Sequence, residues 1–259
     1  MTYLTNNETD FERIILEYEN KIIKYNNNNL ENYKFHFSKA IYYFKKCDYK
    51  ETIEEITICI DLDVDKKDYL LRGICYLENE ETESAISDFN DYISVFLDDY
   101  IGYYFRGISN KILEKYFKAI KDFKSVIKIN KDYIYAYLNL SDVLIQIENY
   151  SDALKCYKEI FSIEPIFEKD DNINYNISIC YFNMKNYNDS LIFINNIDNK
   201  FNGEMFFHRG NIFYELKRTE DAYKDYENAL NNGVEEIYKI IINFKLNKYE
   251  EAIKILKNY

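Results

Sequence analysis

Residues 100–123 have the sequence YIGYYFRGISNKILEKYFKAIKDF, and they decide the fold of this 259-residue chain because their pattern recurs. Gly107 follows Arg106 in an aromatic stretch. Ala119 comes twelve residues after this glycine, and Phe123 comes sixteen residues after it. The same order of an aromatic residue, arginine, glycine, alanine and a second aromatic residue occurs three times in the chain. The three sets are Tyr69, Arg72, Gly73, Ala85 and Phe89; Tyr103, Arg106, Gly107, Ala119 and Phe123; and Phe206, Arg209, Gly210, Ala222 and Tyr226. One structural unit is therefore written at least three times.

The composition favours helices over β-structure. One proline and six glycines in 259 residues are too few for the turns that a many-stranded sandwich or barrel needs every 8–12 residues or so. Hydrophobic residues make up 47% and charged residues 30%, which is typical of a globular protein and excludes a wholly disordered one. We therefore expect a mostly helical protein whose interior is rich in aromatic side chains.

Seven units can be aligned when positions are numbered from the start of each. They begin near Tyr33, Lys66, Tyr100, Ile134, Asp171, Gly203 and Gly233. Position 8 is small in six of them, at Ala40, Gly73, Gly107, Ser141, Ser178 and Gly210. Position 24 is always large and apolar, at Ile56, Phe89, Phe123, Tyr157, Ile194, Tyr226 and Leu256. Because two helices approach closely only where facing side chains are small, position 8 and the alanine-rich position 20 should set the distance within a helix pair.

This pattern resembles the tetratricopeptide repeat, a 34-residue helix–turn–helix unit with a small residue at position 8 and alanine at position 20. The resemblance covers residues 33–259, and the single proline, Pro165, falls at position 32, where the family pattern places one. It implies an all-α fold, a right-handed superhelical solenoid of antiparallel helix pairs. The interval after the fourth unit is stretched to 37 residues, which predicts an enlarged loop at 165–171.

Residues 1–32 precede the array of repeats, which we expect to occupy residues 33–259. Thr9 and Glu12 have the spacing of a capping box, and apolar residues follow at helical spacing up to about Tyr25. We therefore expect a single cap helix that packs on the first repeat, followed by an asparagine-rich loop.

The charge and the cysteines bound the setting in which the protein works. A formal net charge of −12 opposes binding to nucleic acid or to an anionic membrane surface. The five cysteines are spread along the chain without a CxxC pair, which indicates reduced thiols. No secretory signal and no apolar run long enough to span a bilayer is visible, so we expect a cytoplasmic protein.

No set of residues in the sequence predicts catalysis. The two histidines, His36 and His208, are far apart, and none of the common nucleophile, phosphate-loop, dinucleotide or zinc-protease motifs occurs. Carboxylate pairs are frequent, but in so acidic a chain they are expected on solvated helix faces. We therefore predict a protein that is not an enzyme, with no catalytic residue, no cofactor and no metal site.

Positions 7 and 23 vary together across the repeats. Where position 7 is arginine, position 23 is aspartate, in the pairs Arg72 and Asp88, Arg106 and Asp122, and Arg209 and Asp225. A hairpin that folds about position 15 brings these two positions together, so the pattern predicts three structural ion pairs. The alternative is that one repeat subtype was duplicated and its residues were inherited without contact.

The resemblance also implies where a partner binds, because the first helices of tetratricopeptide solenoids line the concave face and present positions 2, 5, 6, 9, 12 and 13 to it. The candidate groove residues are Leu70, Ile74, Tyr104, Ile108, Leu138, Asn139, Asp142, Tyr175, Asn176, Ile179, Phe207, His208 and Asn211. Such an apolar trough suits an amphipathic helix or an extended peptide. The alternative is that these side chains pack within their own hairpins.

Polar residues at position 6 distinguish the fourth to sixth repeats, which have Asn139, Asn176 and His208 there. An amide can both donate and accept hydrogen bonds, and some tetratricopeptide proteins use asparagines at this position to hold a peptide backbone. Asparagine is frequent in this chain, so chance is the alternative. Position 5 is never basic and position 6 has no arginine, so the family's clamp for a chaperone's C-terminal carboxylate is not expected.

The sequence thus predicts a non-catalytic scaffold that binds a peptide or an amphipathic helix of another protein in its concave groove. One alternative is a structural scaffold that self-associates through its ends or its convex face. Another is an RNA reader of the pentatricopeptide type, which has a similar helical period but should have a basic groove.

Overall fold

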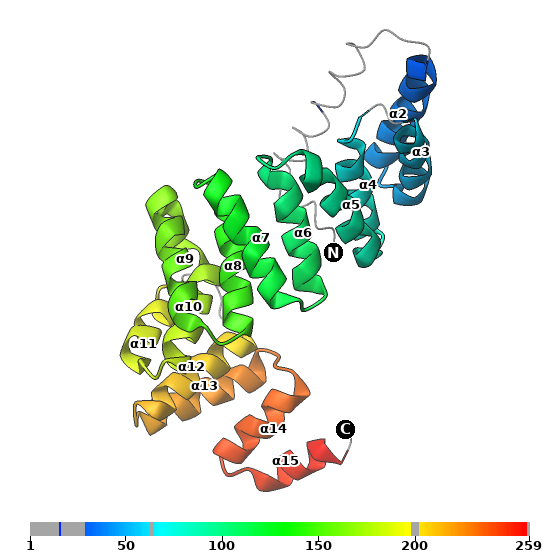
Figure 1. The fold of residues 1–259 in the computed structure, drawn as a ribbon. Coiled ribbons are helices and arrows are strands. Elements are labelled where there is room, and N and C mark those ends of the chain that lie inside the picture. The colour runs from blue at the N-terminus through cyan, green and yellow to red at the C-terminus, as the bar shows by residue number, and fades with distance from the viewer. Residues whose placement is uncertain (1–15, 17–28, 63–64, 198–201, 258–259) are drawn as a thin grey trace. The chain divides into compact units, whose positions relative to one another are not determined.

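The computed structural model describes residue 16 and residues 29–62, 65–197 and 202–257, which form fourteen α-helices and one 3-10 helix (Figure 1). No strand occurs in this described part, so the predicted all-α class is confirmed. The helices are α2 (Asn29–Lys45), α3 (Tyr49–Asp61), α4 (Asp68–Glu78), α5 (Thr82–Val95), α6 (Tyr100–Ile112), α7 (Tyr116–Ile129), α8 (Ile134–Gln146), α9 (Tyr150–Ile163), η1 (Pro165–Lys169), α10 (Asp171–Asn183), α11 (Tyr187–Asn195), α12 (Gly203–Glu215), α13 (Thr219–Asn231), α14 (Glu236–Lys245) and α15 (Tyr249–Leu256).

Consecutive helices pack in pairs that correspond to the predicted repeats. Extensive contacts join α2 to α3, α4 to α5, α6 to α7, α10 to α11, α12 to α13 and α14 to α15. The short turn within each pair makes its helices antiparallel neighbours. Neighbouring pairs also contact each other, as α3 contacts α4, α5 contacts α6 and α9 contacts α10. The apolar face of one hairpin is therefore covered by its neighbour, which is how repeat proteins build a core.

The turn inside each pair has the same backbone conformation. Among the described residues, seven non-glycine residues have φ between 54° and 63°, in the left-handed region: Cys47, Glu80, Glu114, Glu148, Lys185, Lys217 and Asn247. The next residue then donates its N–H to a carbonyl five residues back, as Lys115 does to Asn110 at 2.8 Å, which closes the first helix. Each of the seven lies at position 15 of a predicted repeat, and their spacings are those of the predicted repeat starts.

The N-terminal boundary differs from the sequence prediction. α2 begins at Asn29, four residues before the predicted start of the first repeat near Tyr33, so the helix already includes the last asparagine of the run 26–29 that was predicted as a loop. Glu31 lies in the first turn of α2, where a negative charge interacts favourably with the helix dipole. The predicted cap helix lies outside the described residues, apart from Leu16.

The enlarged loop predicted after the fourth repeat is partly ordered as a helical turn. Residues Pro165–Lys169 form η1, a 3-10 helix with its proline at the first position. Proline suits this position because the N–H that it lacks would have no partner inside the helix. The extra residues of the stretched interval therefore form a short connecting helix between α9 and α10.

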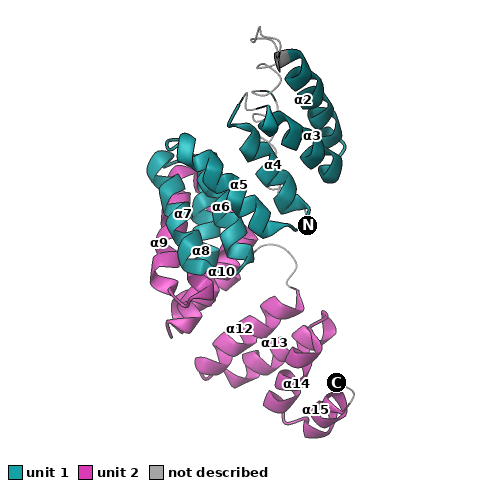
Figure 2. Cartoon of the chain, turned by 45° about the vertical axis from the view of Figure 1, so that its right-hand side comes forward, with its two compact units in different colours: residues 1–143 teal, residues 144–259 magenta. Residues whose placement is uncertain are grey.

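The chain divides into two compact units, Met1–Val143 and Leu144–Tyr259 (Figure 2). The boundary falls inside α8. The first compact unit contains α2 to α7 and most of α8, and the second contains α9 to α15. Each unit is described by itself below.

Glycines at position 8 allow the two helices of a pair to approach closely. A Cβ atom at Gly73 would lie 2.6 Å from the ring of Phe89, and one at Gly107 would lie 2.7 Å from the ring of Phe123. Gly210 has the same relation to Tyr226, also at 2.7 Å. These distances are well inside van der Waals contact. The large residue at position 24 therefore covers the glycine at position 8, a contact that the sequence prediction had assigned to positions 8 and 20.

Candidate functional site

The three predicted arginine–aspartate pairs are in bidentate contact. Arg72 donates from Nε to Asp88 Oδ2 and from Nη2 to Asp88 Oδ1, both at 2.8 Å. The corresponding distances are 3.1 and 2.6 Å for Arg106 with Asp122, and 2.7 and 3.0 Å for Arg209 with Asp225. All three aspartates are 3% exposed, and burial raises the pKa of Asp88, which the Arg72 guanidinium only partly offsets. These pairs hold the two helices of a repeat together.

A third bond from each guanidinium reaches the preceding repeat. Nη1 of Arg72 donates to Thr57 Oγ1 at 3.2 Å. Nη1 of Arg106 donates to Asn90 Oδ1 at 2.7 Å. Nη1 of Arg209 donates to Asn195 Oδ1 at 3.4 Å. The three acceptors all occupy position 25 of the repeat before, so each arginine ties its own hairpin to its neighbour. This link was not predicted from the sequence, although Thr or Asn recurs at position 25 before each repeat that carries the arginine.

In the first compact unit, four predicted groove residues are buried, and their assignment to an accessible groove is wrong. Leu70 and Tyr104 are 4% exposed, Ile74 is 1% exposed and Ile108 is 7% exposed. The ring of Tyr104 packs edge-on against the ring of Tyr133, with centroids 5.1 Å apart. The ring of Tyr104 also lies 6.2 Å, between centroids, from the ring of Phe123 in its own hairpin, in line with the alternative that such residues pack within the repeat.

The remaining candidates of this unit, Leu138, Asn139 and Asp142, are half-buried on α8. The Asn139 amide donates to Tyr135 O at 2.9 Å and accepts from Lys111 Nζ at 3.1 Å. Lys111 also lies 2.7 Å from Asp142 Oδ2. The polar groups of Asn139 and Asp142 are thus engaged inside the protein, with Lys111 as their common partner.

In the second compact unit, His208 is buried in a polar cluster, so its prediction as a groove residue is also wrong. It is 9% exposed, and its Nε2 lies 3.0 Å from the hydroxyl oxygen of Ser178. Ser178 and Ser190 are at the small positions 8 and 20 and are fully buried. Each hydroxyl lies within 2.9 Å of the other serine's backbone carbonyl. Two serines therefore join α10 to α11 where other repeats have glycine and alanine.

The hydroxyl groups of this cluster also lie close to one another. The hydroxyl oxygens of Ser178 and Ser190 are 2.9 Å apart, and either can donate to the other. Whether His208 Nε2 donates to the Ser178 hydroxyl or accepts from it depends on the histidine tautomer. The other histidine, His36, lies 2.6 Å from Glu55 in the first repeat.

Because His208 is buried, we expect the stability of the protein to depend on pH. Burial lowers its pKa from 6.5 to about 4, although a hydrogen bond with the backbone of Ser178 opposes the shift. Between these two pH values the unfolded chain binds a proton at this histidine while the folded chain does not, so this contribution to stability is present above pH 6.5 and is lost as the pH falls toward 4. We expect the free energy of unfolding to fall by about 2 to 3 kcal/mol between about pH 7 and pH 4.5.

Urea unfolding at a series of pH values measures this effect. A His208→Met variant should lack this part of the slope, and subtracting its curve from that of the unaltered protein removes the contribution of the carboxylates. The explanation fails if the two curves have the same slope.

The remaining predicted groove residues lie half-buried on the first helices α10 and α12. They are Tyr175, Asn176, Ile179, Phe207 and Asn211. Burial raises the pKa of Tyr175 to about 12, with smaller contributions from Glu204 and Tyr238. The Asn211 oxygen accepts a hydrogen bond from Tyr226 OH at 3.0 Å. These residues are accessible only in part.

More exposed apolar side chains continue this surface on α12 and α14. Tyr214 is 41% exposed, Ile237 and Phe244 are 48% exposed, and Ile241 is 36% exposed. They occupy positions 5, 9 and 12, which are positions that the resemblance assigned to the groove. α12 and α14 are neighbours, since the rings of Phe207 and Tyr238 are 5.0 Å apart. We call this surface the first-helix face: Tyr175, Asn176, Ile179, Phe207, Asn211, Tyr214, Ile237, Ile241 and Phe244.

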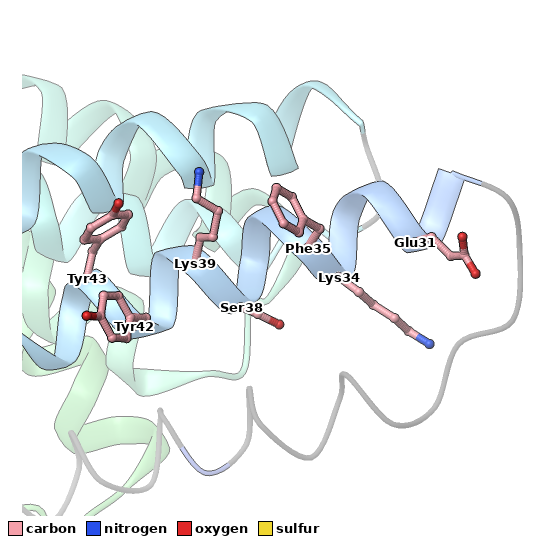
Figure 3. A pocket seen from close by; sticks show the side chains of 7 residues that line it. All are labelled: Glu31, Lys34, Phe35, Ser38, Lys39, Tyr42 and Tyr43. Carbon is pink, nitrogen blue, oxygen red and sulfur yellow. The ribbon is translucent and has the colours of Figure 1, made fainter.

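A pocket lies on the surface of α2, the first helix of the first repeat (Figure 3). Its lining includes Phe35 and Tyr42, which are 59% and 54% exposed. Tyr42 occupies position 10, and the residues at this position in the six later repeats are all 0% exposed: Cys75, Ser109, Val143, Cys180, Ile212 and Ile242. In those repeats, position 10 is a packing position. The α2 pocket therefore lies at a position where the helices of later repeats pack against their neighbours.

The comparisons with known proteins agree with this geometry. The family model of the tetratricopeptide repeat matches residues 134–167, the predicted fourth repeat. The chain is similar to YrrB, a tetratricopeptide repeat protein with an unusual peptide-binding site, with 16% identity, 72% of this chain and 96% of that chain covered, and a TM-score of 0.62. It is also similar to residues 41 to the end of MamA from Desulfovibrio magneticus RS-1, with 18% identity, 64% and 93% covered, and a TM-score of 0.59. No curated protein matches.

The described helices form antiparallel pairs. Each pair has a left-handed residue in its turn, at position 15, and most pairs have a small residue at position 8 where the helices meet. Such repeated helix pairs define a helical-repeat solenoid. Within that class, residues 134–167 match the tetratricopeptide repeat, and the chain shares its fold with solved tetratricopeptide repeat structures, in agreement with the resemblance found in the sequence. None of the helices in the described part is both long enough and apolar enough to cross a bilayer.

Proposed function

We propose that the chain is a non-catalytic scaffold that binds a peptide or a helix of another protein on its first-helix face. The observation that carries this proposal is a difference in exposure at equivalent positions. Position 12 is 1% exposed at Leu77 in the first compact unit, but 41% at Tyr214 and 48% at Phe244 in the second. Position 5 changes in the same way, from 4% at Leu70 to 48% at Ile237.

The chemistry of this face suits an apolar segment of a partner. Aromatic and isoleucine side chains offer a large contact area at a small cost in conformational entropy, and such residues dominate the energy of protein interfaces. They recur at positions 5, 9 and 12, so they follow the first helices as a strip and could accept an amphipathic helix or an extended peptide. The half-buried amides of Asn176 and Asn211 lie on the same helices and would add polar contacts at the edge.

The absence of catalysis in this proposal rests on the one serine–histidine pair in the described residues. The Ser178 hydroxyl is fully buried, and His208 is 9% exposed. A nucleophile must be reached by its substrate. The pair does not meet this condition, and we assign it the role of joining helices. The peptide-binding site in YrrB is a property of that protein and supports this proposal only as a precedent within the fold.

The test uses peptides selected by phage display on the purified chain, with affinities measured by calorimetry. A Tyr214→Ser and Ile241→Ser double variant should bind selected peptides at least about tenfold more weakly, because truncating two interface anchors costs about 1.4 kcal/mol or more. Both side chains are partly exposed in the free protein, so the variant should fold.

The matched control replaces two exposed isoleucines on second helices of the same compact unit, Ile192→Ser and Ile253→Ser, which are 57% and 46% exposed. This control should leave affinity within about twofold of the unaltered protein. Equal losses in both double variants, or a loss in the control alone, would show that binding takes place elsewhere.

A further inference from the structure

Helix α7 carries an exposed basic surface on a protein of net charge −12. Lys118, Lys121, Lys124 and Lys128 are all exposed, and the only acidic residue of the helix, Asp122, is buried against Arg106. Beside the lysines, Phe117 is 81% exposed, which is the highest value among the exposed large hydrophobic side chains of the described residues. This surface therefore has the opposite sign to the protein as a whole.

Most of these side chains lie on one side of the helix. Phe117, Lys121, Lys124 and Lys128 follow one another at intervals of four, three and four residues, which is the spacing of a single helix face. Lys118 lies next to Lys121 at the edge of this face. We call Phe117, Lys118, Lys121, Lys124 and Lys128 the basic face.

The basic face works against the stability of its own helix. The other second helices, α3, α5, α9, α11, α13 and α15, all have an acidic residue in their first turn, whereas α7 has none. Lys118 lies in that turn instead, where the helix dipole disfavours a positive charge. The pairs Lys121 with Lys124 and Lys124 with Lys128 add repulsion between like charges at adjacent positions. A packing role therefore does not explain these lysines.

Lys118, Lys121, Lys124 and Lys128 form no ion pair with a carboxylate among the described residues, whereas Lys155 on the next second helix pairs with Asp152 at 2.6 Å. Next to the basic face lies a hollow of about 270 Å³ between α5, α6 and α7. Its lining residues are Ile86, Asn90, Arg106, Asn110, Lys115, Lys118, Lys121 and Asp122. The Asp122 carboxylate is held by Arg106 and Asn110, so the three lysines are the charged groups of this recess that an anionic group could contact.

We propose that the basic face is a second docking surface, which binds an acidic segment of another protein that also carries an apolar side chain to cover Phe117. The sign of the charge selects an acidic partner. Electrostatic interactions extend about 8 Å at physiological ionic strength, so a short acidic segment is attracted by these lysines alone. A nucleic acid duplex carries a charge about every 1.7 Å and would extend over the acidic remainder of the protein, which repels it.

The proposal does not depend on the first-helix face. The basic face lies on a second helix of the first compact unit, whereas the first-helix face lies on α10, α12 and α14 of the second. Variants that abolish one site should therefore leave the other unchanged, and the protein could bring two partners together.

Fluorescence anisotropy tests the proposal with a short fluorescein-labelled peptide of glutamates around a central phenylalanine. The full chain should bind it, and affinity should fall about tenfold or more between about 50 and 300 mM NaCl because the contacts are ionic. A Lys121→Gln and Lys124→Gln double variant should bind about five- to tenfold more weakly, and Phe117→Ser should weaken binding separately.

The matched control is Lys155→Gln with Lys158→Gln, because these exposed lysines occupy the same positions 22 and 25 in the next repeat, on α9. This control should retain the affinity of the unaltered protein. An equal loss in the control, or equal binding of a peptide with glutamine in place of glutamate, overturns the proposal. So does tighter binding of a DNA duplex or of phosphatidylserine vesicles at the same salt. Self-association that the α7 variant abolishes would assign the face to a second copy and would also overturn it.

Discussion

Replacing Arg106 by leucine is expected to lower the free energy of unfolding by about 3 kcal/mol, because the change leaves the Asp122 carboxylate buried without its cation. Asp122 is 3% exposed, and Arg106 holds it through two hydrogen bonds. The Asn110 amide still donates to Asp122 at 3.0 Å, which keeps the loss at the low end of the range for broken buried pairs. The third bond, to Asn90, is lost as well, so part of the cost falls on the contact between repeats.

Urea unfolding followed by circular dichroism measures this loss. A variant in which Asp122→Leu is added to Arg106→Leu should recover much of the stability, since replacing both partners by apolar groups removes the unpaired charge. Arg218→Leu is the exposed control: Arg218 pairs with Asp221 with both side chains about half exposed, so its loss should cost little. A similar cost for Arg106→Leu and Arg218→Leu would contradict the assignment.

Replacing Gly107 by valine is the second change with a large expected effect, again about 3 kcal/mol of lost stability. The new Cβ would lie 2.7 Å from Cε1 of Phe123, a ring that is fully buried and cannot move aside without displacing its neighbours. Overpacking of this kind costs about 1–3 kcal/mol even before the branched side chain is accommodated. Valine has a better helix propensity than glycine, so propensity alone predicts the opposite sign.

Thermal and urea unfolding should both show the loss. Adding Phe123→Leu to Gly107→Val should restore part of it, because a smaller residue at position 24 leaves room for the new methyl groups. Ser87→Val, at an exposed site in α5, controls for the effect of valine in a helix and should change stability by less than about 1 kcal/mol. Without rescue in the double variant, contact with Phe123 cannot be the cause.

The two proposed surfaces suggest a division of roles between the compact units. The first-helix face is apolar and lies in the second unit, whereas the basic face carries four unpaired lysines and lies in the first. An apolar face supplies affinity through buried area, while a charged face supplies selectivity and faster association. A scaffold with both could distinguish two partners by chemistry alone.

Much of the fold follows from local rules that the sequence displays. The small residues at positions 8 and 20 predicted that the two helices of a repeat would pair closely, and the structure places Phe123, at position 24, against Gly107. The covariation of positions 7 and 23 predicted the contact between Arg106 and Asp122, because both residues belong to one hairpin with a fixed turn. Such contacts depend on residues close together in the sequence, so periodicity is enough to predict them.

The candidate site was harder to predict because accessibility depends on neighbouring hairpins. Tyr104 and Phe207 both occupy position 5, yet Tyr104 is buried beside Tyr133 while Phe207 is only half-buried. His208 occupies a position that the family uses for binding, but it lies under other side chains, bonded to Ser178. A position in the repeat therefore does not say whether a side chain is exposed.

The sequence by itself determined the class of protein, the helix pairs, the turn at position 15 and the ion pairs within each repeat, because these depend on spacing within one hairpin. The tertiary structure decided which of the predicted groove residues remain accessible, that His208 is buried and neutral, and that each arginine also reaches the preceding repeat. The physical reason is that burial is set by what packs on a helix from outside its own repeat, and that packing is not written in the repeat's own pattern.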